Sequence, residues 1–135
     1  MNYKWHSQGQ DTSCFVVAAA NAAVYAGIGK KFSMEEAKDI ALCRHGGTIN
    51  CRGVVDYIGT PLRPVKTPRM VLARGGIINI MHPIFNGHSI FIFKDGRGYT
   101  MINSWLGPNV LRGICKETIL KFTCDRLGHH WYLAT

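Results

Sequence analysis

The sequence predicts an α+β fold in which N-terminal helices pack against a C-terminal antiparallel sheet. Apolar residues follow a helical spacing in the first part of the chain, up to about residue 58, and alternate with a period of two in the segments between residues 77 and 105. The segment Asp95-Gly96-Arg97-Gly98 has the composition of a tight turn between two strands, which makes those strands antiparallel. With 135 residues, 47% of them hydrophobic, the chain is expected to form one domain over 1–135.

Three helices are expected in the first part of the chain. They cover residues 14–26, residues 33 to about 41 or 43, and residues 51–58. The first is a run of apolar or small residues interrupted only by Asn21, and Gly27 supplies its stop. Ser33 stands three residues before Glu36, which is the spacing of a capping box at the start of the second helix. Asn50 or Thr48 can cap the third helix.

The remainder of the chain is expected to supply the sheet. Three prolines between residues 60 and 68 exclude a helix there and favour an extended connection with a short edge strand at 62–66. A helical turn or two is expected at 69–74, and a further helix-like pattern covers 115–124. The expected strands lie at 77–81, 88–93, 99–105 and 130–134.

The net charge gives only weak information about the class of partner. The net charge of +8 suggests an anionic partner such as nucleic acid only weakly, because no basic run exceeds two residues and a scattered basic surface is the simpler interpretation.

The N-terminus lacks the apolar stretch of a signal peptide, and no run is as long as a membrane span. A cytoplasmic protein without a membrane segment is therefore expected, and secretion by a route that uses no signal peptide stays open.

The chain contains an odd number of cysteines, so at least one thiol stays unpaired in any intramolecular disulfide pattern; they are Cys14, Cys43, Cys51, Cys115 and Cys124. In a reducing compartment all five would be free, and whether the last four are paired is left open. Cys43, His45 and Cys51, completed by His82 or the pair His129-His130, raise the alternative of a zinc site. Their spacing matches no common zinc-binding motif, so neither a metal nor another cofactor is expected.

One cysteine has the sequence setting of a nucleophile. Cys14 opens the first helix, where the helix dipole and unpaired backbone N–H groups favour the thiolate. His88 opens a predicted strand, and Asn103 lies on the next strand across a short hairpin, so the amide oxygen can accept a hydrogen bond from the imidazole and fix its tautomer. Trp105, two residues further, falls on the same face and can shield that bond from water.

The three short segments Gln8-Gly9 with Ser13-Cys14-Phe15, Asn86-Gly87-His88, and Asn103-Ser104-Trp105 resemble the motifs of the papain-like cysteine peptidases. In its compactness the chain is similar to the peptidase domains that trim double-glycine leaders, as in bacteriocin processing. The resemblance implies a papain-like fold, with Cys14 as nucleophile, His88 as general base and acid, and Asn103 as the residue that orients it. It also implies that the Gln8 amide and the Cys14 backbone N–H form the oxyanion hole, and that Trp105 shields the triad.

The expected activity is hydrolysis of a peptide bond in a protein or peptide substrate through a thioacyl-enzyme intermediate. Little chain is available for an extended substrate cleft, so a glutamine deamidase or an acyltransferase acting on a protein is the first alternative. The second is a catalytically inactive binding module for an anionic partner, as the net charge suggests.

Overall fold

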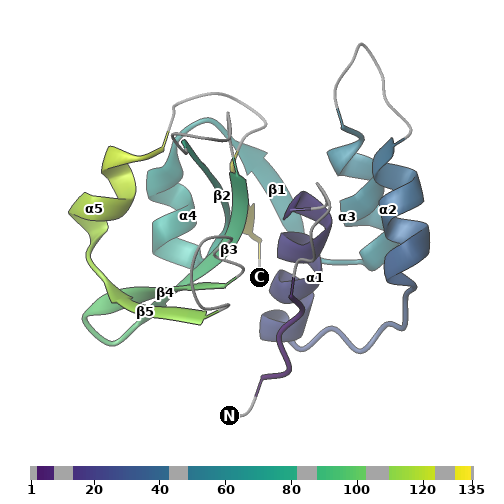
Figure 1. Ribbon diagram of the computed structural model, residues 1–135, viewed down its shortest axis with the longest axis horizontal. Helices are drawn as coiled ribbons and strands as arrows, with labels where there is room; N and C mark the ends of the chain where they lie inside the picture. Colours follow the sequence, from purple (N-terminus) through teal and green to yellow (C-terminus); the bar gives the residue numbers. More distant parts are fainter. Residues whose placement is uncertain are drawn as a thin grey trace.

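The computed structural model describes residues 3–7, 14–42, 49–81, 88–102, 110–123 and 130–134 (Figure 1). Its elements are α1 (Cys14–Ala26), α2 (Met34–Leu42), α3 (Cys51–Ile58), β1 (Leu62–Val65), α4 (Pro68–Arg74), β2 (Gly76–Ile80), β3 (His88–Asp95), β4 (Gly98–Ile102), β5 (Val110–Ile114), α5 (Lys116–Lys121) and β6 (His130–Leu133). One apolar cluster joins α1, α2 and α3 to one face of the sheet, and a second joins α4 and α5 to the other. The α+β class expected from the sequence is confirmed.

Side-chain caps confirm the predicted starts of α2 and α3. The Ser33 hydroxyl accepts a hydrogen bond from the Glu36 backbone N–H at 3.3 Å, at the start of α2. Asn50, rather than Thr48, caps α3, because its Oδ1 accepts from the Gly53 N–H at 3.0 Å. Gly59 ends α3 in the left-handed conformation, with φ of 83°.

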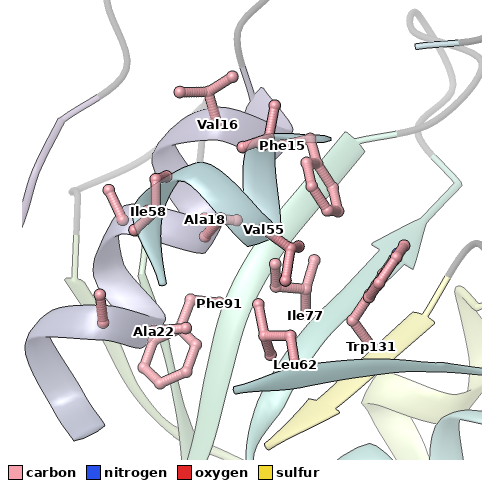
Figure 2. Close-up of a cluster of buried hydrophobic side chains, with 14 of the residues drawn as sticks. Phe15, Val16, Ala18, Ala22, Val55, Ile58, Leu62, Ile77, Phe91 and Trp131 are labelled. Atoms are coloured by element: carbon pink, nitrogen blue, oxygen red, sulfur yellow. The ribbon is translucent and has the colours of Figure 1, made fainter. Parts of the chain in front are cut away.

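Helix α1 lies between the sheet and α3 and is buried from Phe15 to Ala23. Figure 2 shows Ala18 and Ala22 of α1 in the same cluster as Ile58 of α3 and Phe91 of β3. Small side chains let the helix backbone approach its neighbours closely, as its alanine-rich sequence leads us to expect. The central position of α1 fixes the place of its first residue relative to the sheet.

The six strands of the described chain are antiparallel, in the order β1-β6-β2-β3-β4-β5. The end of β2 meets the start of β3, where Ile80 pairs with His88. The start of β6 lies beside the end of β1, where His130 pairs with Val65. In Figure 1 these strand ends and the starts of α1 and α3 lie at the same, upper end of the molecule.

Strand β5 is the element that the sequence pattern does not predict. It pairs with β4 at the edge of the sheet, and its three central residues are exposed. Its register shifts between Tyr99 and Met101, and Gly113 has φ of 73°. Without a buried face there is no alternation of apolar and polar residues, so only the pairing with β4 defines this strand.

The described helices are too short, or too polar, for any of them to cross a membrane.

Candidate active site

Cys14 is the first residue of α1, and its side chain is half-buried. The neighbouring ring of Phe15 packs edge-on against Trp131, with 5.7 Å between ring centroids. Among the described residues, the cysteines are all free thiols: Cys14, Cys51 and Cys115. Cys43 and Cys124 lie outside the described residues. The predicted position of Cys14 at the start of a helix is confirmed by the bounds of α1.

A second thiol lies close to Cys14. Cys51 is the first residue of α3, and α3 packs against α1. Burial, and secondly the negative charge of an ionised Cys14, raise the pKa of Cys51 to about 11. Cys51 is therefore a neutral thiol near pH 7. Cys51 opens a predicted helix, as Cys14 does, so this position in the sequence is the signal that relates the two thiols.

Trp131, Phe15 and Arg52 form an aromatic and cationic wall. Phe15 and Arg52 directly follow Cys14 and Cys51 in the chain. The guanidinium carbon of Arg52, next to Cys51, lies 5.1 Å from the centroid of the Trp131 ring. Trp131 is only 4% exposed and also contacts Phe15, so the wall is anchored in the core. The exposed Arg52 head places a positive charge at this end of the molecule.

His88 is the first residue of β3 and is buried. It pairs with Ile80 and, by strand alternation, shares a side of the sheet with Ile90, which packs toward α4. Helix α1 covers the opposite side, that of Phe91. His88 and α1 therefore lie on opposite sides of the sheet. The imidazole can reach Cys14 only around the end of the sheet at which β3 starts, and not across the face that α1 covers.

The other predicted site residues, Gln8, Asn103 and Trp105, lie outside the described residues. Their neighbours in the chain are placed. Ile102, which precedes Asn103, pairs with Phe91 of β3, the strand that His88 opens. The segment 3–7, which precedes Gln8, contacts α1 and β3. The roles of these three residues remain predictions.

His130, considered above as a metal ligand with His129, is fully buried at the start of β6. Its Nδ1 accepts a hydrogen bond from the Asn79 backbone N–H at 3.3 Å, which supports the end of β2. Within the described ranges, no three His, Cys, Asp or Glu side chains gather as a metal site. The remaining candidate ligands of that alternative, Cys43, His45, His82 and His129, lie outside those ranges.

Neither a protein-family model nor a curated protein matches this chain. Among solved structures, the chain is similar to the peptidase domain of Streptococcus ComA, described as a bi-functional ABC transporter involved in a quorum-sensing pathway. The TM-score is 0.68 at 14% sequence identity, and the match covers 96% of each chain. This likeness confirms the papain-like fold that the motifs implied.

Cys115 is expected to react with alkylating reagents faster than Cys51. Cys115 is exposed, and its Sγ lies 2.9 Å from Thr118 Oγ1; hydrogen bonds from the Thr118 side chain and backbone lower the pKa of Cys115. Near pH 7 iodoacetamide should therefore label Cys115 well before Cys51, whose thiolate fraction is on the order of one in ten thousand. Peptide mass spectrometry of timed samples measures both rates, and equal rates would contradict the assigned pKa directions.

Proposed function

We propose that this protein is a papain-like cysteine peptidase that hydrolyses a peptide bond through a thioacyl-enzyme intermediate. The observation that carries the proposal is the likeness to a peptidase domain over 96% of the chain, together with a free, half-buried cysteine at the first residue of α1. The buried His88 opens β3 at the same end of the molecule (Figure 1). The ordered motifs around Gln8, Cys14, His88 and Asn103 support the assignment of roles.

In the proposed reaction His88 takes the proton of Cys14, and the thiolate attacks the carbonyl carbon of the scissile bond. The oxyanion of the tetrahedral intermediate accepts hydrogen bonds from the Gln8 amide and the Cys14 backbone N–H. The C–N bond then breaks as His88 returns the proton to the leaving amine, which leaves a thioester on Cys14. Asn103 holds the imidazole in the required tautomer, and Trp105 shields their hydrogen bond.

Water completes the turnover. His88 removes a proton from a water molecule, the resulting hydroxide attacks the thioester carbonyl, and the C–S bond breaks to release the acid and regenerate the thiol. No cofactor enters this sequence of steps, and the substrate is a protein or a peptide.

The proposal is tested by incubating a peptide library derived from a proteome with the wild type and with Cys14→Ala. New peptide termini that depend on Cys14 are the expected result. Glutamine converted to glutamate, or joined to an amine, without new termini would replace hydrolysis by deamidation or acyl transfer on the same fold. No product of either kind, combined with salt-sensitive binding of nucleic acid that Cys14→Ala leaves unchanged, would favour the binding module.

A further inference from the structure

Asn21 is the polar exception in the apolar helix α1, and it is fully buried between alanines two turns after Cys14. Burial of an amide side chain without hydrogen bonds is unfavourable, because the amide loses its hydrogen bonds to water and gains none in return. A buried asparagine at this position therefore requires partners that use both its donor and its acceptor.

Both partners come from one residue of the N-terminal segment. Asn21 Oδ1 accepts a hydrogen bond from the His6 backbone N–H at 2.7 Å, and Asn21 Nδ2 donates to the His6 carbonyl oxygen at 3.2 Å. The amide side chain thus pairs with His6 in the way that a neighbouring strand would pair with it. The contact fixes both the position and the direction of the backbone at His6.

The same segment is held a second time by an aromatic side chain. The Trp5 ring lies 6.0 Å from the Phe91 ring and 5.9 Å from the Phe93 ring, centroid to centroid, and the Phe93 pair is stacked. Phe91 and Phe93 are buried residues of β3, on the side of the sheet that α1 covers. The segment is therefore held against both the helix and the sheet just before residue 8.

We propose that Asn21 is a positioning residue that holds the oxyanion donor Gln8 in place relative to Cys14. Gln8 follows His6 by two residues, a length of chain that spans at most about 7 Å. Cys14 and Asn21 belong to one rigid helix, so the nucleophile and the anchor of the Gln8 segment move together. This inference rests on the proposed function, because it assumes the oxyanion hole of a thiol hydrolase.

Two reagents distinguish the positioning of Gln8 from a change in the reactivity of the Cys14 thiol itself. Attack of Cys14 on p-nitrophenyl acetate passes through a tetrahedral oxyanion; the C–S bond forms, the ester C–O bond breaks, and nitrophenolate leaves. Alkylation by iodoacetamide displaces iodide at a saturated carbon and forms no oxyanion. Both rates are measured on Cys14 by peptide mass spectrometry in a Cys115→Ser background, which removes the exposed thiol among the described cysteines.

Asn21→Ala is expected to slow acetylation of Cys14 roughly ten- to a hundredfold, less than the loss expected for Gln8→Ala, and to leave alkylation unchanged. His6→Pro removes the N–H that donates to Asn21 from the other side of the contact and should reproduce the effect. Combining either variant with Gln8→Ala should add nothing further, because the donor is already absent.

Thr60→Val is the matched control, since the Thr60 hydroxyl makes a buried hydrogen bond to the Ala19 carbonyl oxygen of the same helix at 3.1 Å. It should lower the unfolding temperature and leave acetylation unchanged. If Gln8→Ala slows acetylation while Asn21→Ala and His6→Pro do not, the positioning role is wrong and the proposed function stands. If wild-type Cys14 is acetylated no faster than Cys51, or if Gln8→Ala has no effect, the oxyanion hole itself is wrong and the positioning role is wrong with it.

Discussion

Cys14→Ala is expected to lower the rate of ester and peptide hydrolysis by a factor of at least about ten thousand, because it removes the only atom that forms the acyl bond. Alanine is a good helix former and replaces a half-buried side chain at the start of α1, so the fold should be retained. The measurement is a steady-state assay with an activated ester or a cleaved library peptide, accompanied by the intact mass of the trapped acyl-enzyme.

Cys115→Ala is the control for this substitution, because Cys115 is an exposed free thiol at the start of α5 and belongs to no part of the proposed site. It should remove the fast background labelling and leave turnover unchanged. Full turnover in Cys14→Ala, or a loss of turnover in Cys115→Ala alone, would show that the nucleophile has been wrongly assigned.

Gly76→Ala is expected to destabilise the fold by several kcal/mol, an amount comparable with the whole free energy of unfolding of a small domain. Gly76 has φ of 153°, a conformation that residues with a side chain rarely adopt. An added Cβ would overlap the carbonyl oxygen of Trp131 and lie 2.9 Å from the Cα of Tyr132, and these backbone atoms of β6 are paired with β2. Strands β2 and β6 would therefore have to separate at this position.

Chemical denaturation followed by circular dichroism measures this effect. Gly29→Ala is the matched control, since nothing lies within 4 Å of a Cβ added at Gly29. It should unfold at nearly the wild-type denaturant concentration, whereas Gly76→Ala should be largely unfolded before denaturant is added. Equal midpoints for the two variants would contradict the close approach of β2 and β6.

The sequence predicts most elements of this fold because their boundaries depend on local chemistry. Ser33 and Asn50 each accept a hydrogen bond from the backbone N–H three residues further along, and the turn at Asp95 to Gly98 joins β3 directly to β4. These interactions span few residues, so their spacing is visible in the chain. The edge strand β5 is defined only by its partner, and local patterns do not reveal it.

The candidate site is predictable in its residue types but not in its spatial arrangement. The start of a helix and the start of a strand locate Cys14 and His88 in sequence. Which side of the sheet His88 shares with its neighbours depends on the register of β3 against β2. The nearness of Cys51 to Cys14 and the pairing of Asn21 with His6 depend on packing between segments far apart in the chain.

The strand order has a consequence for synthesis of the protein. Strand β6, from the last residues of the described chain, inserts between β1 and β2, which are made much earlier. While the ribosome still holds residues 130–133, β1 lacks the strand with which it pairs in the described sheet, and β2 exposes an unpaired edge to other chains. The Trp131 side chain that supports Arg52 and Phe15 arrives at the same late moment. The contacts of Trp131 with Arg52 and Phe15 should therefore form only after β6 has left the exit tunnel.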